Sequence, residues 1–596
     1  MNDNQTDVIS KARRQVTLLR RYLSHARRAL TRVNQYKRWI KEREKLATGF
    51  AGDYQKLATH GDLPTISLLV PVYNPPVALL RECLESVIAQ VYPHWQLCIA
   101  DDASTDSQVR DCLLEFSKRD PRIKVVFREE NGHIVKASNT ALELVAGDYV
   151  GLLDHDDLLA PHALLRVAQQ VVANPELLLV YSDEDKIDAR GKRSNPHFKP
   201  DWNPDLLLGL NYICHLTVFR TQLIRSVGGF REGTEGSQDH DLLLRCMPYL
   251  KNRNVTRIPD VLYHWRTIKG STAASPSGKD YTHNAGLRAV SDYLAAHHPG
   301  AQVVEGPLSN SYRTKWPLPD PLPKVSLLIP TRDGVNILKP CVDAILKNTD
   351  YTALEVLILD NQTTCPRTLA YFDELAVDDR VAIHRWDHPF NFSAINNFGA
   401  KMATGDIIGL VNNDIEPINA DWLREMVSHA VRPDIGCVGA KLYYPNGAIQ
   451  HAGVILGIGG VAGHSHKYFS PNSYGYFLRL KLVQNLSAVT GACLLVRKSV
   501  FDEVGGLDEE HLAIAFNDVD FCLKVREAGY RNIWTPYAEL YHHESASRGP
   551  EDTEKNRERF LRETRVMRDR WGKVLDLDPA YNPNLTRRRE DFSLAL

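Results

Sequence analysis

Several features that mark common protein classes are missing from this sequence. Its ten cysteines include no C-x-x-C pair, which argues against a disulfide framework or a zinc site and favours a reduced compartment. No apolar run reaches the roughly 18 residues that a membrane span needs. The first residues show no apolar signal-peptide core, and the net charge of −1 gives no reason to expect nucleic acid as a partner. These absences predict a soluble chain that works in the cytoplasm.

What the chain does have is length and one concentration of charge. Its 596 residues are too many for one hydrophobic core, so at least two domains are expected. Thirteen Lys or Arg stand against three Asp or Glu in residues 7–50, where apolar residues recur every three or four positions from Leu19 to Val33. This pattern predicts a basic helix with a narrow apolar seam. The seam could pack on a domain or on a second copy of the chain, and the helix could also lie on an anionic membrane surface.

An internal repeat covers most of the chain. ISLLVPVYN (66–74) returns as VSLLIPTRD (325–333), LCIADDAS (97–104) as VLILDNQT (356–363), and GDYVGLLDHDD (147–157) as GDIIGLVNNDI (405–415). The offsets are 259 residues for Pro71 and Pro330, 259 for Asp101 and Asp360, and 258 for Asp156 and Asp414. The constant register indicates a tandem duplication.

Each copy alternates short β-rich runs with helical stretches, which predicts a mostly parallel sheet with helices on both faces. A segment with five prolines separates the copies. The expected organisation is an N-terminal basic helical segment (1–60), a first domain (61–305), a proline-rich linker (306–323), a second domain (324–575) and a C-terminal tail (576–596).

Polar residues follow the strands at the places where a parallel sheet binds ligands. No G-x-G-x-x-G follows the first strand, so a dinucleotide site is not expected. The acidic run DHDD (154–157) would repel itself without a cation, and hard ions such as Mg²⁺ or Mn²⁺ take carboxylate and phosphate oxygens. Simple helix capping remains the alternative for Asp102 and for this run.

Two later motifs could complete a reaction centre. QDHD (238–241) opens a helix, where its first acid, Asp239, could act as a general base or could simply favour the helix dipole. His264 lies in a YHW motif and recurs as His542 in the second copy, so it could contribute to a metal site or be structural.

This order of motifs resembles the family 2 glycosyltransferases of the GT-A fold, which use nucleotide sugars and a metal ion and invert the anomeric centre. The resemblance rests on PVYN (71–74), ADD (100–102), DHDD, GGF with QDHD (228–241) and YHW (263–265). The second copy is similar to bacterial rhamnosyltransferase-type members through VTGACLLVRKSVFDEVGGLDE (489–509), FNDVDFCLKVREAGY (516–530) and YHHESASRG (541–549). The fold class implied is α/β, with two GT-A (Rossmann-like, mostly parallel sheet) domains in tandem after the basic helical segment.

The resemblance also implies a role for individual residues. The catalytic bases would be Asp239 and Asp518. The donor would be bound by Pro71, Tyr73, Asn74, Asp101, Asp102 and Asp154 in the first copy, and by Pro330, Thr331, Arg332, Asp360, Asn361, Asn412 and Asn413 in the second. The ion, Mg²⁺ or Mn²⁺, would be bound by Asp156 and His264, and by Asp414 with His542 or His543.

The copies differ at one point that bears on activity. Asn412 replaces Asp154, so the second site has one carboxylate fewer and a weaker hold on metal is expected, although Asp414 and Asp518 remain. We expect a bifunctional enzyme that assembles a bacterial surface polysaccharide such as an O-antigen or capsule, on an oligosaccharide or lipid-linked acceptor. The basic helix could then place the enzyme peripherally on the cytoplasmic face of the inner membrane. One catalytic domain beside a donor- or glycan-binding module is the second hypothesis, and a non-catalytic scaffold is the third.

Overall fold

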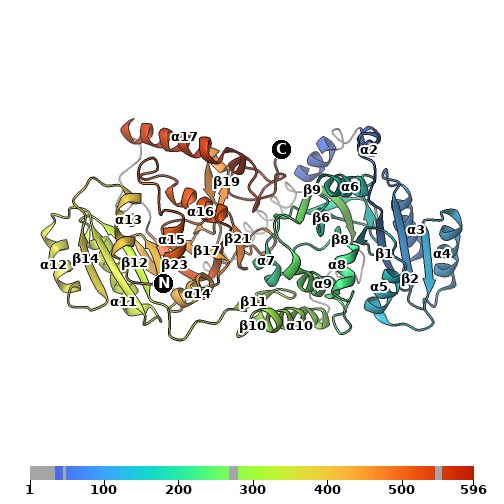
Figure 1. The fold of residues 1–596 in the computed structure, drawn as a ribbon, viewed down its shortest axis with the longest axis horizontal. Coiled ribbons are helices and arrows are strands. Elements are labelled where there is room, and N and C mark those ends of the chain that lie inside the picture. The colour runs from blue at the N-terminus through green and yellow to red at the C-terminus, as the bar shows by residue number, and fades with distance from the viewer. Residues whose placement is uncertain (1–33, 44–48, 268–279, 544–553) are drawn as a thin grey trace, which may run out of the picture.

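The computed structural model describes residues 34–43, 49–267, 280–543 and 554–596. Two α/β domains lie side by side, each built around one large sheet (Figure 1). The expected basic seam from Leu19 to Val33 lies outside the described residues. Residues 34–43, which directly follow it, are helical.

The first domain follows the predicted alternation of strands and helices. A nine-stranded sheet has the order β3-β2-β1-β4-β8-β6-β9-β5, with β7 paired to β6. The elements in chain order are α2 (Phe50–Ala58), β1 (Ile66–Val72), α3 (Val77–Ile88), β2 (Trp95–Asp101), α4 (Ser107–Arg119), β3 (Ile123–Phe127), α5 (His133–Glu143), β4 (Tyr149–Leu152), β5 (Leu158–Leu159), α6 (Ala163–Ala173), β6 (Leu179–Ile187), β7 (Arg193–His197), α7 (Pro204–Gly209), β8 (Thr217–Arg220), α8 (Thr221–Ser226), α9 (Gln238–Cys246), η1 (Met247–Tyr249), β9 (Val255–Arg266) and α10 (Asp280–His297).

The second domain repeats this order in a ten-stranded sheet, β14-β13-β12-β15-β22-β17-β23-β16, to which β18 and β21 add at the sides. Its elements are β12 (Val325–Thr331), α11 (Val335–Asn348), β13 (Leu354–Asp360), α12 (Pro366–Leu375), β14 (Val381–Arg385), α13 (Phe392–Met402), β15 (Ile407–Val411), β16 (Ile415–Pro417), α14 (Trp422–Ala430), β17 (Ile435–Tyr443), β18 (Ile449–His451), β19 (Val454–Leu456), η3 (Ile458–Gly460), β20 (Ala462–His464), η4 (Tyr476–Leu478), β21 (Gln484–Leu486), β22 (Cys493–Arg497), α15 (Lys498–Glu503), α16 (Asn517–Glu527), β23 (Arg531–His542) and α17 (Glu554–Asp576).

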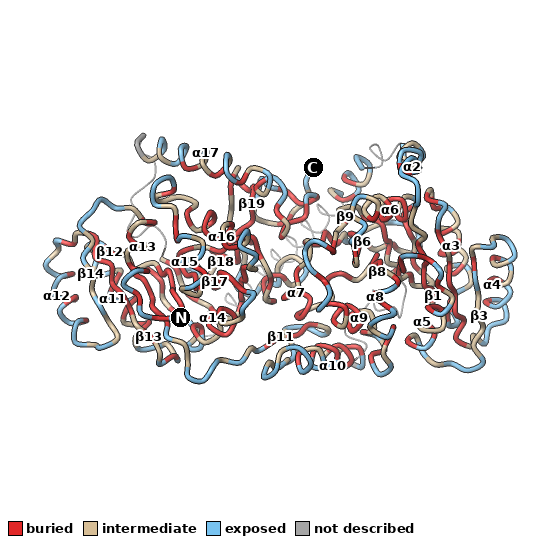
Figure 2. The backbone as a smooth tube through the Cα atoms, viewed as in Figure 1, coloured by how far each residue is buried: buried red, intermediate tan, exposed pale blue. Residues whose placement is uncertain are grey.

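The register of the central strands is the same in both sheets. Ile66 pairs with Trp95 and with Tyr149, and Val325 pairs with Leu354 and with Ile407, all in parallel. The strands are continuous apolar runs because helices cover both faces, and they form the buried centre of each domain (Figure 2). The later strands are partly antiparallel, so both sheets are mixed. The fold predicted from the repeat and the family resemblance is confirmed.

Between the domains, part of the segment predicted as a linker is a strand. β10 (Gln302–Glu305) and β11 (Tyr312–Lys315) pair antiparallel. This hairpin and α10 lie along one edge of the molecule (Figure 1). Arg313 of β11 reaches the second domain, where its Nη2 donates to Glu425 Oε2 at 2.8 Å. The segment between the repeats therefore contacts the second domain directly.

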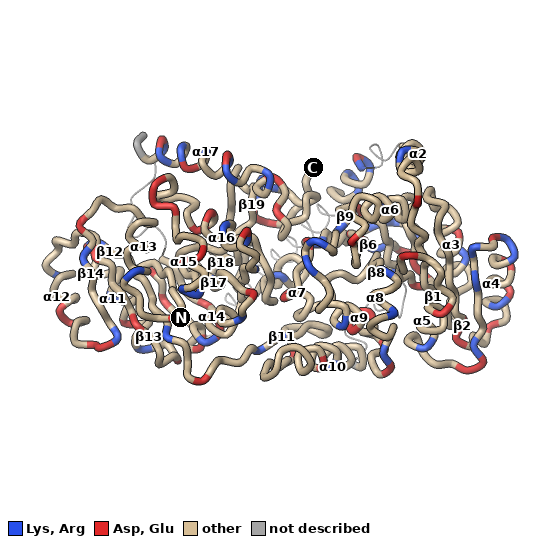
Figure 3. The backbone as a smooth tube through the Cα atoms, viewed as in Figure 1, with Lys and Arg blue, Asp and Glu red and all other residues tan. Residues whose placement is uncertain are grey.

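The domains also contact each other through polar side chains. Asp205 of the first domain accepts from Arg432 Nη1 at 2.6 Å and lies 3.3 Å from Arg531 Nη2. Burial alone would raise the pKa of Asp205, but these two guanidinium groups lower it well below its ordinary value. The Asn203 side chain bonds to the Asn485 backbone across the same contact, and Asn485 Nδ2 donates to Asp205 Oδ2 at 2.8 Å. Basic and acidic residues are otherwise interspersed along both domains (Figure 3).

Residues after α17 pack between the two domains. Asn582 Nδ2 donates to Asp183 Oδ2 at 2.8 Å and to the Lys199 carbonyl at 2.9 Å, both in the first domain. One apolar cluster contains residues of the helix at 34–43, of both domains and of the segment after α17. Its buried members are Tyr36, Trp39, Phe198, Val261, Ile455, Ile458, Tyr581, Leu585 and Phe592. Among the described residues, no helix is both long enough and apolar enough to cross a membrane.

Candidate active sites

The ends of β1 and β2 place the first predicted donor residues side by side. Pro71 pairs with Ala100 and Val72 with Asp101. Asp102 is engaged by Arg128 Nε at 2.8 Å and by the Gly132 N–H at 2.9 Å, whereas Asp101 Oδ1 is buried and accepts no hydrogen bond from the described residues. A buried carboxylate oxygen without a donor is costly. Asp101 is therefore better placed than Asp102 to accept from a ligand N–H or hydroxyl.

The loop after β1 is held by a side chain in both domains. Asn74 has a φ of 45° and its Oδ1 accepts from the Thr105 N–H at 2.9 Å. Asp333 has a φ of 50° and its Oδ1 accepts from the Thr364 N–H at 2.9 Å. Asn74, a predicted donor residue, and Asp333, its counterpart in the second domain, thus stabilise the loops at the sheet edge. Their neighbours Tyr73 and Arg332 are exposed there.

The DHDD run of the first domain places carboxylates close to His215, which lies just before β8. Asp154, Asp157 and His215 each offer a ligand atom within 4.8 Å of one another. Asp157 accepts from the Tyr263 hydroxyl at 2.6 Å, and burial, with Asp154 and Asp156 nearby, raises its pKa well above the ordinary value. A bound cation would offset that repulsion, so these residues fit a divalent ion.

The predicted ligand His264 is oriented by a carboxylate that the sequence did not single out. His264 Nδ1 lies 2.6 Å from Asp185 Oδ1 in β6, which leaves Nε2 for a ligand. The other Asp185 oxygen accepts from the Tyr36 hydroxyl at 2.5 Å and from Arg193 Nε at 2.6 Å. The helix at residues 34–43 thus holds a residue of the first site through a buried carboxylate.

The second domain brings three of its predicted residues together. His542 Nε2 lies 3.2 Å from Asn412 Nδ2 and 3.2 Å from Asp414 Oδ1. His542 Nδ1 faces Gln450 Oε1 at 2.7 Å, so with Nδ1 as the donor Nε2 carries a lone pair. Asp414 Oδ1 accepts no hydrogen bond from the described residues. In that tautomer Nε2 accepts from Asn412 Nδ2, and its separation of 3.2 Å from Asp414 Oδ1 matches the spacing of neighbouring ligands of an ion with bonds of about 2.1 Å.

Other predicted residues of the second domain lie around this group. His543 faces Glu416 at 3.2 Å and is not part of it. Asn413 Nδ2 donates to Thr331 Oγ1 at 3.0 Å, which connects two predicted donor residues. Asp360 accepts from Arg385 Nη1 at 2.7 Å, and the neighbouring Asn361 Oδ1 is buried without a hydrogen bond from the described residues. The free acceptor at this edge has therefore moved from Asp101 in the first domain to Asn361 in the second.

The two acids at the start of each late helix have different environments. In α9, Asp241 is paired with Arg231 at 2.6 Å and Arg245 at 2.7 Å, whereas Asp239 accepts only from Asn211 Nδ2 at 2.8 Å among described side chains. The second acid is therefore structural in the first domain, and the first acid stays available.

The same division holds in α16. Asp520 accepts from Arg570 Nη1 at 2.6 Å and Trp571 Nε1 at 2.8 Å. Asp518 accepts from the Gly491 N–H at 2.8 Å, forms no ion pair with a described residue, and has a pKa raised by burial. A raised carboxylate pKa makes Asp518 a stronger base.

Three site residues were not predicted from the sequence: His215, Asp185 and Gln450. The signal for Asp185 was the acidic run in YSDEDKI (181–187), which is unusual in an otherwise apolar strand. His451 was also missed. Its Nδ1 lies 2.8 Å from His464 Nδ1, and its Nε2 accepts weakly from the Thr490 N–H beside Asp518.

Comparison with known proteins agrees with the repeat. A family model described as glycosyl transferase family 2 matches residues 67–228 and 326–505, more than half of the chain. The uncharacterized protein y4gI of Sinorhizobium fredii is 52% identical over 94% of this chain and 61% of its own length. The O-antigen biosynthesis protein RfbC of Myxococcus xanthus is 39% identical over 94% of this chain and 43% of its own length. The chain thus spans about half the length of these relatives.

A solved structure of a mannosyltransferase is among those similar to this chain. The mannosyltransferase PcManGT of Pyrobaculum calidifontis, solved with GDP-Man and Mn²⁺, aligns at 18% identity and a TM-score of 0.33 over 44% of this chain and 74% of its own. The matches to the family model in both copies confirm the resemblance that the sequence motifs predicted.

Proposed function

The chain belongs to glycosyl transferase family 2, and from that premise we propose that both of its domains are catalytic. Each would transfer a sugar from a nucleotide-diphosphate donor to a growing bacterial surface polysaccharide, with inversion. The similarity to a protein named for O-antigen biosynthesis supports this class of product. The rhamnosyltransferase-type motifs of the second domain make rhamnosyl or hexosyl transfer the specific proposal there.

The observation that carries the proposal is that the two acids at the start of α9 are paired in the same way as the two acids at the start of α16. In both domains arginine side chains neutralise the second acid, Asp241 or Asp520, and no described cation pairs with the first, Asp239 or Asp518. A domain that only bound glycans would have no need to keep an unpaired carboxylate at that position. This shared pairing supports a catalytic base in each copy.

The proposed reaction is a single displacement. The Asp239 or Asp518 carboxylate accepts the proton of the acceptor hydroxyl while the hydroxyl oxygen bonds to the anomeric carbon and the bond to the diphosphate oxygen breaks. Asp154, Asp157 and His215, with the predicted ligands Asp156 and His264, would hold a divalent ion in the first domain, and Asp414 and His542 would hold one in the second. When bound, the ion would neutralise charge on the departing diphosphate. Asp101 and Asn361 offer free acceptors for the nucleoside.

The acceptor is proposed to be an oligosaccharide or a lipid-linked glycan. A lipid-linked acceptor would bring the enzyme to the cytoplasmic face of the membrane, with the basic N-terminal segment in contact with anionic lipid. Within the described part of that segment, Tyr36 and Trp39 are buried against the first domain. Membrane contact would therefore have to come from residues other than these two.

The proposal is tested with Asp239→Asn and Asp518→Asn in the full chain. Products from a panel of nucleotide sugars are analysed for linkage, and each substitution should remove one linkage, by roughly 10² to 10⁴ in rate, while the other persists. Asp111→Asn, on the exposed side of α4, is a control that should retain both linkages. Loss of both linkages from either substitution, with the thermal unfolding temperature unchanged, would contradict two independent sites.

A second candidate function is supported by the neutral residues Asn412 and Asn413. Because Asn412 replaces the Asp154 carboxylate and Asn413 replaces His155, the second domain could bind a donor or glycan and leave transfer to the first domain. In that case Asp518→Asn would leave every product unchanged. Nucleotide-sugar binding to the full chain would still persist in the Asp239→Asn variant.

A further inference from the structure

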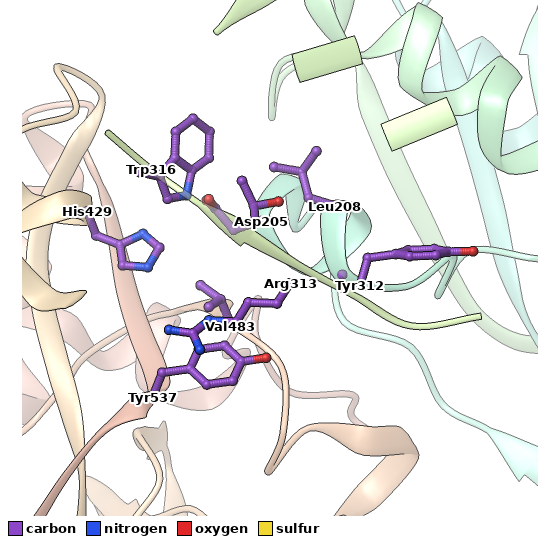
Figure 4. Close-up of a pocket in the computed structure, with 10 residues that line it drawn as sticks. Asp205, Leu208, Tyr312, Arg313, Trp316, His429, Val483 and Tyr537 are labelled. Carbon is purple, nitrogen blue, oxygen red and sulfur yellow. The ribbon is translucent and has the colours of Figure 1, made fainter. Parts of the chain in front are cut away.

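A hollow lies at the junction of the domains, and none of the strand-end acids lines it. Its volume is about 430 Å³, and its walls come from both domains. Arg313 and Lys315 of β11 line one side, and Lys441 of β17, Lys481 and Tyr537 line the other. It adjoins the small pocket of Figure 4, in which Arg313 lies against the Tyr537 ring at 3.7 Å.

The lining is predominantly basic. Four cationic side chains face two carboxylates: Arg313, Lys315, Lys441 and Lys481 against Glu305 and Glu539. Glu539 is already engaged, since it accepts a short hydrogen bond from the Tyr443 hydroxyl. The Arg313 charge is engaged too, by Glu425. The lysines therefore determine what the hollow can bind.

Lys441 is the feature that indicates a ligand. Its side chain is 1% exposed, yet its ammonium makes one hydrogen bond with the described residues, to the Leu480 carbonyl at 3.3 Å, and lies 4.0 Å from Glu539. An ammonium has three N–H donors, and leaving donors of a buried charge unmet is costly. Burial and the nearby Lys481 lower the pKa of Lys441 to about 8. An anion in the hollow would supply the missing acceptors.

The residue types favour phosphate over carboxylate. Planar carboxylates are best bound by the two-pronged arginine fork, and the one arginine here is occupied by Glu425. Lysine ammonium groups act as point charges that suit phosphate oxygens. The volume exceeds what one phosphate needs, so the hollow has room for an attached sugar beside Tyr537.

We propose that this junction hollow binds a phosphorylated sugar, with the phosphate on Lys315, Lys441 and Lys481 and the sugar ring near Tyr537. No predicted donor or metal residue lines this hollow, which depends on the contact between the two domains. A ligand bound there touches β11 on one side and β17 and β23 on the other. Its occupancy would hold the two domains together.

The test is calorimetric binding of glucose 1-phosphate and inorganic diphosphate to the full chain in a chelating buffer, where no divalent ion supports the strand-end sites. Both probes should bind the wild type. Lys315→Ser and Lys441→Met should each weaken binding by about tenfold, the loss of one charged hydrogen bond. Lys124→Ser, an exposed lysine of β3, should leave the affinity unchanged, as should Asp414→Asn.

The outcomes are distinguishable from those for the transferase proposal because no turnover is measured. No binding to the wild type would overturn the site, as would equal affinity in all the lysine variants or equally tight binding of glucuronate. Lys315 lies on the exposed rim, so its variant is informative even if Lys441→Met fails to fold. A prenyl-diphosphate sugar that binds more tightly than glucose 1-phosphate would support a lipid-linked ligand, and equal binding would support a free sugar phosphate.

Discussion

The two domains present the same strand ends with different charges. At matched positions the first site has Asp154, His155, Asp156 and Asp157, and the second has Asn412, Asn413, Asp414 and Ile415. Both domains fix a histidine through its Nδ1, but the partner is the Asp185 carboxylate in the first and the Gln450 amide in the second. Both changes remove negative charge. Duplication has thus kept the geometry of the site while its electrostatics diverged, and metal affinity is the property that should differ most.

The largest effect on metal affinity is expected at the acid that both copies retain, Asp156 in the first domain and Asp414 in the second. Asp414→Asn would leave the second site without a carboxylate on its strand-end loop, whereas Asp156→Asn would leave Asp154 and Asp157 in the first. The Mn²⁺ concentration for half-maximal formation of each linkage should rise by more than about a hundredfold in the second domain and by about tenfold in the first. An equal rise in the Mn²⁺ requirement of both linkages would contradict a difference in metal affinity between the two sites.

The residue that holds each histidine should have the next largest effect. Asp185→Asn weakens the hold on His264 and should raise the Mn²⁺ requirement of the first linkage by about ten- to a hundredfold. Gln450→Glu should lower the requirement of the second linkage, because a carboxylate makes His542 a better ligand. Asp185→Asn also weakens the ion pair with Arg193, so the thermal unfolding temperature of this variant is measured as a control for lost stability. An unchanged Mn²⁺ requirement in both variants would show that these partners are only structural.

Restoring the lost acid should have a moderate effect. Asn412→Asp would return a carboxylate beside Asp414 and His542, and should lower the Mn²⁺ requirement of the second linkage by about tenfold. The matched substitution Asp154→Asn should raise that of the first linkage. If Asn412→Asp instead weakens metal dependence, the second domain has adapted to a site with less charge.

The smallest effect is expected from the helix at residues 34–43. Tyr36→Phe removes one buried hydrogen bond to Asp185, about 1 kcal/mol, and should raise the Mn²⁺ requirement of the first linkage by about fivefold. The ring still packs on Trp39, so stability should change little. The second linkage acts as the internal control, and a change there would contradict a local effect.

The sequence predicted those parts of the structure that depend on local pattern. The apolar runs 66–72 and 325–331 are strands because helices cover both faces, and their constant offset reproduces the shared register. Asp154 and Asp414 were located by the simple fact that they follow such runs. The orienting residues were missed because they come from distant segments: His264 and Asp185 are 79 residues apart and His542 and Gln450 are 92. Periodicity carries no information about such pairs.

The residues around Asn582 have a consequence for how the protein is made. Asp183 lies in the first sheet, and Asn582, which satisfies its buried carboxylate, follows 399 residues later. During synthesis the first domain emerges long before this partner does, so it must wait through translation of the whole second domain with an incomplete core. The first domain is therefore the last part to be completed, and a fragment cut at the linker would lack a part of its own interior.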